Sequence, residues 1–211
     1  NIKILNKRPL IYYTIKEAIK SKLISEYIVS TDSQEIKRIS EKYGASVPFL
    51  RPKKYSLDSS SSSDALKHAV NFMERKNKIK YDFIIEIMAT NPLKNVKDID
   101  SVILKLIKTK ADSVIAMSRV IEQHPRRLKK IINDRIVDIM PEIKESRRQD
   151  LKPEIYIRTG SIYGLDRNIF VKKGLRYGTK NSRPYILPYE RSINIDGEND
   201  FILANYLIKN S

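Results

Sequence analysis

Short apolar segments alternate with segments of helical periodicity along this chain, and this alternation constrains the fold more than any other feature. Residues 81–88 are mostly apolar, residues 98–107 place apolar side chains at helical spacing, and residues 112–117 are apolar again. Strands and helices in this order bury their apolar surface when helices cover both faces of one sheet. We therefore expect an α/β fold, a three-layer sandwich with a mostly parallel sheet.

The first part of the chain follows the same pattern. Apolar residues at helical spacing extend from Pro9 to about Leu23, and strands are expected at residues 27–29 and 46–50. A serine run at residues 59–63 continues directly into another helical pattern. We interpret this run as a loop and a helix start, not as a domain boundary.

The pattern changes between residues 120 and 157. Short, charged, β-like pieces occur there, at residues 128–132 and 136–139. No internal repeat and no second folding unit is visible in the sequence. We expect one domain over residues 1–211, with residues 120–157 forming a small inserted arm.

The chain carries a formal net charge of +16, which makes nucleic acid the first partner to consider. The lysines are dispersed along the expected helices, and the sequence lacks known nucleic-acid-binding motifs. The charge therefore indicates a general attraction for anions, including nucleoside triphosphates and sugar acids. There are no cysteines, which fits the cytoplasm and excludes disulfides, and no apolar run reaches membrane-spanning length. We expect a cytoplasmic protein without a membrane segment.

A polar step near the end of the chain places an acid and an amide two positions apart. In an extended strand Asn194 and Asp196 share one face, and Ile193 and Ile195 share the other. Gly197 then breaks the strand before a helix. Either Asp196 caps this helix, or Asp196 and Asn194 hold a divalent cation at the end of a strand. The segment by itself favours the cap.

Polar side chains follow several of the expected strands. They are Asp32, Arg51, Thr90, Asn91 and Asp196. Open parallel sheets bind their ligands beyond the carboxyl ends of the strands. We expect one cleft to collect these side chains.

The order of short motifs along the chain is more specific than any single motif. They are NIKIL at 1–5, PLIYYTI at 9–15, IVSTD at 28–32, LRP at 50–52, TNPL at 90–93, HP at 124–125, RRQDL at 147–151, GSIY at 160–163 and RSINID at 191–196. Over nearly the whole chain, this order resembles the acylneuraminate cytidylyltransferases, the CMP-sialic acid synthetases and their relatives. The resemblance implies a nucleotidyltransferase-type, Rossmann-like sheet. It also implies transfer of CMP from CTP to the anomeric hydroxyl of a nonulosonic 2-keto sugar acid, with release of pyrophosphate and with Mg²⁺ as cofactor.

The resemblance also implies roles for single residues. For binding the nucleotide they are Asn1, Arg51, Ser61 and Ser62. For binding the sugar they are Met88, Thr90, Arg127, Thr159 and Tyr163. For catalysis they are Asp196 and Arg148, and for the metal Asp196 and Asn194. Simpler interpretations stay open: Arg51 and Arg127 as ordinary surface cations, the serines as a helix cap, and Tyr163 as sheet core.

The sequence departs from the family pattern at several of these positions. Met88 stands where many members have glutamine, and Thr159 where they have asparagine. Since a lost amide removes a hydrogen bond to the sugar, we expect a sugar acid other than ordinary N-acetylneuraminate. Asn194 replaces a second aspartate, so the cation should be held more weakly. The family's glycine-rich phosphate loop would precede Asn1, and we expect the chain to be a fragment of a longer product; a degraded or inactive copy is the alternative.

The resemblance further implies that the arm at residues 120–157 exchanges between two subunits, and we expect a homodimer. Apolar residues of the arm, such as Ile131 and Ile136, need a surface that covers them. Three other functions stay open. They are a related sugar nucleotidyltransferase for an eight-carbon keto acid, a non-catalytic paralogue, and a basic nucleic-acid-binding domain, against which the dispersed lysines argue.

Overall fold

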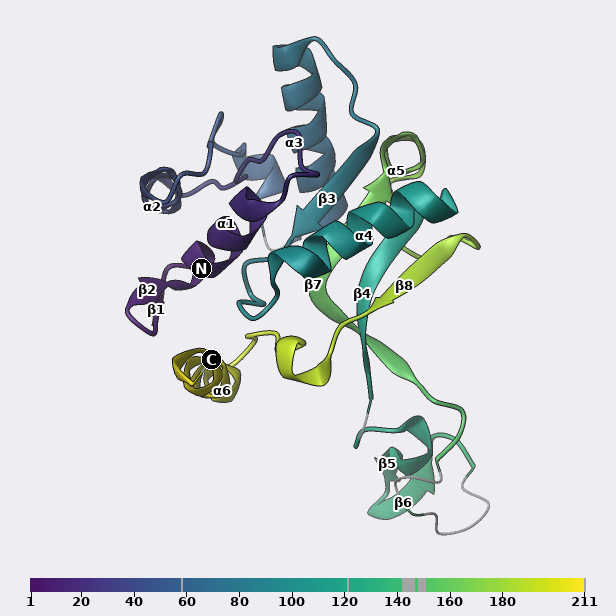
Figure 1. Ribbon diagram of the computed structural model, residues 1–211. Helices are drawn as coiled ribbons and strands as arrows, with labels where there is room; N and C mark the ends of the chain where they lie inside the picture. The colour runs from purple at the N-terminus through teal and green to yellow at the C-terminus, as the bar shows by residue number, and fades with distance from the viewer. Residues whose placement is uncertain (58, 121, 142–146, 148–150, 211) are drawn as a thin grey trace.

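A computed structural model describes residues 1–57, 59–120, 122–141, 147 and 151–210 (Figure 1). In chain order the elements are β1 (Ile4–Leu5), β2 (Arg8–Pro9), α1 (Leu10–Lys20), α2 (Gln34–Lys42), η1 (Lys53–Tyr55), α3 (Ser62–Asn77), β3 (Phe83–Ile87), α4 (Val96–Thr109), β4 (Ser113–Arg119), η2 (Pro125–Arg127), β5 (Lys129–Ile132), β6 (Arg135–Asp138), β7 (Tyr156–Asp166), α5 (Arg167–Lys173), β8 (Ser182–Ile186), η4 (Tyr189–Arg191) and α6 (Glu198–Lys209). Within these ranges, no helix combines the length and the apolar character that crossing a bilayer requires.

The main sheet has four strands in the order β3-β7-β4-β8. β7 pairs antiparallel with both β3 and β4, whereas β8 pairs parallel with β4. β3, β4 and β8 therefore run in one direction and β7 runs against them. The α/β class is confirmed, but the mostly parallel sheet is not, because the sheet is mixed. The physical reason is that β7 returns from the arm and enters between two earlier strands, an arrangement that local patterns do not encode.

Two expected strands near the start of the chain are not formed as regular strands. The segments at residues 27–29 and 46–50 are joined only by isolated parallel bridges, Ile28 with Ser46 and Thr31 with Leu50. The expected strands at residues 81–88 and 112–117 are confirmed as β3 and β4.

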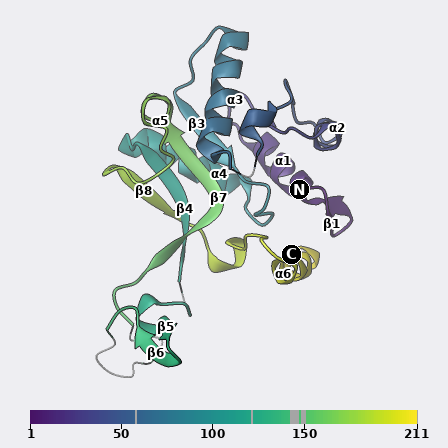
Figure 2. The same ribbon diagram turned by 180° about the vertical axis from the view of Figure 1, so that it is seen from behind.

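One face of the sheet is covered by α4, which lies in front of the sheet in Figure 1 and behind it in Figure 2. Val102 and Leu106 of this helix are fully buried in a cluster with Val114 and Ile162 of the sheet. Gly164 of β7 permits this close approach, since a Cβ there would lie 2.6 Å from Val102 Cγ1 and 2.7 Å from Leu106 Cδ1.

The opposite face of the sheet is covered by α5 and by the first part of α3. Ile115, Tyr163 and Leu165 form a cluster with Phe170 of α5, and Leu66 of α3 packs against it. Helices on both faces of one sheet make the expected three layers. We call this side of the sheet the tyrosine face, after Tyr163.

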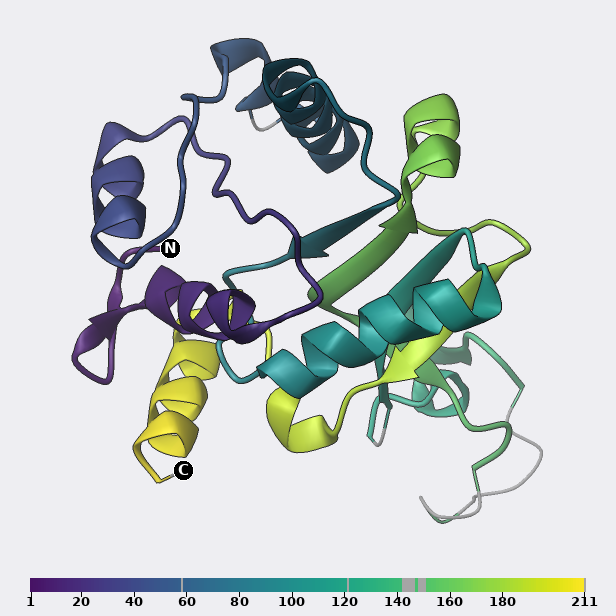
Figure 3. The same ribbon diagram turned by 45° about the horizontal axis from the view of Figure 1, so that its top comes forward.

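The two ends of the chain pack together beside the sheet, as Figure 3 shows for α1 and α6. Leu5, Leu10 and Ala204 form the buried centre of this contact. Ile193 and Ile195 add to the same cluster, so the segment before α6 is fixed by its apolar side chains.

Between β4 and β7 the chain makes the expected excursion, which ends in the β5–β6 hairpin apart from the main sheet (Figure 1). All eight residues of the two hairpin strands are exposed, and Ile131 and Ile136 are 71% and 74% exposed. The β-like pieces expected here are confirmed. A dimerising role of the arm stays a prediction.

Candidate active site

Segments that follow two strands meet at one edge of the sheet. β3, β4 and β8 end at this edge, which we call the carboxyl edge, and β7 begins there. The backbone N–H of Ile195 donates to the carbonyl of Thr90 at 2.8 Å. The side chain of Asn91 donates to the carbonyl of Arg191 at 3.0 Å. Thr90, Asn91 and the segment that carries Asp196 therefore lie together, as the strand ends indicate.

A buried lysine fixes the loop after β3. Lys94 is 2% exposed, and its ammonium donates to Thr14 Oγ1, Met88 O and Asn91 O at 2.8, 2.6 and 2.5 Å. Three acceptors match the three N–H bonds of an ammonium. Burial lowers the pKa of Lys94 to about 7, although Asp98 and Glu17 act in the opposite direction.

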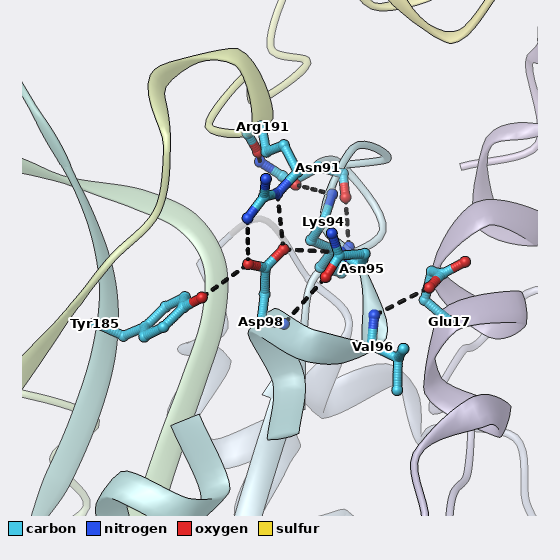
Figure 4. Close-up of polar contacts among 8 residues, drawn as sticks. All are labelled: Glu17, Asn91, Lys94, Asn95, Val96, Asp98, Tyr185 and Arg191. Carbon is cyan, nitrogen blue, oxygen red and sulfur yellow. Dashed lines mark hydrogen bonds and ion pairs between the residues drawn. The ribbon is translucent and has the colours of Figure 1, made fainter. Parts of the chain in front are cut away.

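A buried carboxylate joins this loop to the segment after β8 (Figure 4). Asp98 is fully buried and accepts from Arg191 at 2.8 and 3.1 Å, from the Tyr185 hydroxyl at 2.9 Å and from the backbone of Asn95 at 2.9 Å. Asn95 in turn caps α4, completing a capping box. The contacts of Asp98 thus set the position of η4 relative to α4.

The polar step at residues 193–196 is an extended loop and not the expected strand. Its predicted alternation is nevertheless confirmed. Ile193 and Ile195 pack into the apolar cluster of the chain ends, and Asn194 Nδ2 donates to Asp196 Oδ2 at 2.8 Å. Asn194 also lies against Gly160 of β7, where a Cβ would be 3.5 Å from Asn194 Oδ1.

The helix after this step is not capped by Asp196, so that interpretation is wrong. Gly197 is the N-cap residue of α6, and Asp200 Oδ2 accepts from the backbone N–H groups of Asp196 and Gly197 at 3.1 and 2.9 Å. The carboxylate three residues into the helix reaches back to the cap more easily than Asp196 reaches forward. The Asp196 carboxylate is therefore not used by the helix, and its side chain is exposed.

Oxygen atoms at this step are suited to a hard cation. Within the described ranges, the buried Asn194 Oδ1 has no hydrogen-bond partner. Buried polar atoms are normally paired with protein, water or ion. No group of three or more Asp, Glu, His or Cys side chains that could hold a metal occurs in the described residues. A cation here would therefore take most of its ligands from elsewhere.

Four predicted sugar-binding residues lie on or near the carboxyl edge. Met88 and Tyr163 both pack on the tyrosine face. The backbone carbonyl of Thr90 accepts from Ile195 N–H, as described above. Thr159 is buried, and its hydroxyl donates to Ala116 O at 3.1 Å. The fifth, Arg127, is in η2 within the arm excursion. Arg148, predicted to be catalytic, lies outside the described residues.

The predicted nucleotide-binding residues occupy other places. Arg51 pairs with Asp32 at 3.4 Å and donates to Ser56 at 3.0 Å. Ser61 is the N-cap of α3, and Ser62 is the first residue of that helix. The carbonyl of Asn1 accepts from the backbone of Ile11 at 2.9 Å. The helix-cap interpretation is confirmed for Ser61, and the contact of both serines with a nucleotide stays a prediction.

A row of stacked side chains extends across the tyrosine face. Arg176 donates to Glu86 at 2.5 Å, and its guanidinium carbon lies 4.8 Å from the centroid of the Tyr163 ring. The centroids of the Tyr163 and Tyr177 rings are 6.3 Å apart. The guanidinium carbon of Arg158 lies 3.8 Å from the centroid of the Tyr177 ring. Burial raises the pKa of Glu86, and Arg176 opposes that shift. Burial also raises the pKa of Tyr163, against the charges of Arg176 and Arg158.

Sequence reasoning did not find the network that holds this edge together. Its central members are Lys94, Asp98 and Arg191. The spacing of Asn95 and Asp98 is a capping-box signal that could have identified where α4 begins. No local signal marks a lysine that becomes buried or an arginine whose carboxylate partner is 93 residues away.

Comparison with known proteins identifies the family. The cytidylyltransferase family model matches residues 1–173. The chain belongs to the cytidylyltransferase family. Among relatives, pseudaminic acid cytidylyltransferase of Campylobacter jejuni is 29% identical over 96% of this chain and 86% of its own length. The CMP-N,N'-diacetyllegionaminic acid synthase of Legionella pneumophila is 28% identical over 99% and 89%. The resemblance to acylneuraminate cytidylyltransferases is confirmed.

Solved structures of cytidylyltransferases share the fold. A CMP:2-keto-3-deoxy-manno-octonic acid synthetase complexed with CTP superimposes with a TM-score of 0.71 over 99% of this chain and 91% of that one. The sequence identity is 13%, so this likeness concerns the fold only.

Proposed function

We propose that this cytidylyltransferase transfers CMP from CTP to the anomeric hydroxyl of a nonulosonic 2-keto sugar acid and releases pyrophosphate. The observation that carries the proposal is the carboxyl edge, where Thr90, Asn194 and Asp196 are brought together by contacts between distant segments. Relatives named for pseudaminic and legionaminic acid, similar over nearly the whole chain, support this substrate class.

The reaction needs positioning and charge neutralisation more than covalent help from the protein. The sugar hydroxyl oxygen forms a bond to the α-phosphorus of CTP, the bond from that phosphorus to the pyrophosphate oxygen breaks, and the hydroxyl proton is released. The edge suits this chemistry, because Lys94 and Asp98 fix the two segments that approach it. A rigid edge lowers the entropic cost of aligning the two substrates.

Mg²⁺ is the cofactor that we propose for this edge, held by Asp196 and Asn194. The residues fit such an ion, since one carboxylate and one unpartnered amide oxygen lie on the same step. Mg²⁺ usually binds through one or two protein groups, with phosphate oxygens and water completing its shell. When bound, the ion would neutralise charge on the triphosphate.

The sugar that we propose is of the pseudaminic or legionaminic type and not N-acetylneuraminate. Met88 presents a thioether to the tyrosine face, and the Thr159 hydroxyl is already used by Ala116 O. Neither side chain supplies the amide that many family members place there. Fewer amide contacts favour a sugar whose substituents are less polar at this position.

We also propose a homodimer in which the β5–β6 hairpin contacts the partner subunit. The exposed Ile131 and Ile136 side chains support this assembly, because apolar groups on a projecting hairpin are stabilised when another surface covers them.

The test is turnover of CTP with a panel of sugar acids in the presence of Mg²⁺. The panel contains pseudaminate, legionaminate, N-acetylneuraminate and the eight-carbon keto-octonate. We expect CMP-sugar with one of the first two at the highest kcat/KM. Higher kcat/KM with N-acetylneuraminate would contradict the proposed sugar, and product from keto-octonate alone would contradict the nonulosonic class. Salt-sensitive DNA binding that CTP does not compete would favour the nucleic-acid alternative.

A further inference from the structure

Most cations near the carboxyl edge already have acceptors. Lys94 is buried and donates to three oxygen atoms. The arginines and their carboxylate partners are Arg119 with Glu154 at 2.9 Å, Arg176 with Glu86 at 2.5 Å and Arg191 with Asp98 at 2.8 Å. An anionic substrate gains little from a cation whose charge is already matched.

Arg158 is the exception in the described part of this edge. It is exposed, and no acidic side chain among the described residues pairs with it. Its guanidinium carbon lies 3.8 Å from the centroid of the Tyr177 ring. The Tyr177 ring covers one face of the planar guanidinium and restrains its orientation. The N–H groups at the rim of the guanidinium stay free to bind a ligand. A restrained guanidinium loses less entropy when it binds a carboxylate by two parallel hydrogen bonds.

The position of Arg158 places it beside the predicted sugar-binding residues. It pairs with Met117 of β4, so the two side chains lie on the same face of the sheet. Met117 packs in the cluster that contains Tyr163 and Met88, and the Tyr177 ring lies 6.3 Å from the Tyr163 ring. Arg158 therefore lies on the tyrosine face, at the end where the substrates of the proposed reaction would meet.

We propose that Arg158, held by Tyr177, binds the carboxylate of the sugar acid and thereby selects acids over neutral sugars. This inference rests on the proposed function, because a nonulosonic acid supplies the carboxylate. It assigns Tyr177 a positioning role: the ring orients the guanidinium and does not contact the sugar. The proposed role also explains why Arg158 stacks on Tyr177 and has no acidic partner among the described residues, although it lies beside the proposed site for an anionic sugar.

The test compares variants by binding of the sugar acid and of its C1 carboxamide, with titration calorimetry in the presence of Mg²⁺ and a saturating CTP analogue with a methylene group in place of the α,β-bridging oxygen, so that no turnover occurs. Arg158→Gln should weaken binding of the acid at least about tenfold, the value of one charge-assisted pair, and leave the affinity for CTP within about twofold. The unsubstituted protein should prefer the acid to the amide, and Arg158→Gln should lose that preference. Arg158→Lys keeps the positive charge but cannot form two parallel hydrogen bonds. Its affinity for the acid should lie between those of the unsubstituted protein and of Arg158→Gln.

Two further variants separate the proposal from general charge or folding effects. Arg183→Gln removes an exposed arginine of β8 near the opposite edge of the sheet and should leave acid binding unchanged. Tyr177→Leu should weaken binding of the acid less than Arg158→Gln does. Arg158→Gln that binds the acid as tightly as the unsubstituted protein, or still discriminates acid from amide, overturns this inference and leaves the proposed function intact. Failure of the unsubstituted protein to bind any nonulosonic acid overturns both.

Discussion

Asp98 and Arg191 form a two-point ion pair across 93 residues of sequence, and the carboxylate of that pair is completely buried. The pair connects the first turn of α4 to η4, immediately before the step that carries Asn194 and Asp196. Arg191 also presents its backbone carbonyl to Asn91 in the other loop of the edge. The two loops of the candidate site are thus held through one buried carboxylate.

Asp98→Asn should destabilise the protein by about 3 kcal/mol, because it removes the charge of a fully buried carboxylate that accepts from Arg191, Tyr185 and Asn95. The amide NH₂ of the new asparagine would also face N–H and O–H groups that now donate to the carboxylate. Urea unfolding followed by circular dichroism measures the change. The exposed pair of Lys3 and Glu198 provides the control, and Glu198→Gln should change stability by less than about 0.5 kcal/mol. Equal effects of the two substitutions would contradict the structural role given to Asp98.

The stability contribution of Lys94 should depend on pH. Its pKa is about 7 in the folded protein against an ordinary value of 10.5, so between these values the unfolded chain binds more protons. Stability therefore rises with pH across this window, and below pH 7 the full cost of burying the charge remains. Relative to Lys94→Met, the unsubstituted protein should gain stability from pH 7 to pH 10. A free-energy difference that is flat or falls over that range would contradict this prediction.

Asp196→Asn should abolish turnover without loss of stability, since the side chain does not cap α6. Asn194→Asp should lower the Mg²⁺ concentration needed for half-maximal rate, because it adds a charged oxygen. Asp200→Ala is the matched control: it removes the cap acceptor, costs about 1 kcal/mol, and should keep turnover at low temperature. Normal turnover of Asp196→Asn would contradict the metal-binding role proposed for Asp196.

Gly164→Ala should destabilise the protein by about 2 kcal/mol through overpacking between β7 and α4. The new methyl group would meet Val102 and Leu106 well inside van der Waals contact. Gly178→Ala serves as comparison: its Cβ has no atom within 4 Å, so its cost comes only from a backbone φ of +88°. Thermal unfolding of both variants measures the difference, and a smaller loss for Gly164→Ala would show that α4 can move away from the sheet.

The β5–β6 hairpin is the surface that we propose for dimer formation. Ile131→Lys combined with Ile136→Lys should shift the protein from dimer to monomer, with dimer dissociation at least about tenfold easier, because two exposed apolar groups that the proposed dimer would cover become charged. Sedimentation equilibrium at micromolar concentration measures the mass. Leu104→Lys, an exposed leucine of α4 outside the hairpin, should leave the mass unchanged. A monomer before any substitution would remove the proposed homodimer.

Much of the fold could be predicted from local patterns. The apolar run that became β3, the helical spacing of α4 and the alternating pieces of β5 and β6 each carry their own periodicity. The alternation at residues 193–196 was correct for the side chains even though no strand forms, because the extended backbone alone sets which side chains share a face.

The order of strands could not be predicted in this way. β7 is antiparallel to both neighbours because the chain returns through the arm and enters between β3 and β4. Local patterning records whether a segment is extended and which face is apolar, but it does not record its direction or its neighbours. The prediction that Asp196 caps α6 was wrong for a similar reason. Asp196 and Asp200 both carry a carboxylate that can accept from the first N–H groups of the helix, and only the geometry of the chain selects Asp200.

The sequence by itself determined the α/β class, most of the elements and the family, because these depend on periodicity and on motifs read along the chain. Only the tertiary structure decided that Lys94 is buried, that Asp98 meets Arg191, and that Arg158 stacks on Tyr177 without an acidic partner in the described residues. The reason is physical: burial and pairing of a charge depend on which distant segments surround it, and those neighbours are set by the packing of the whole chain.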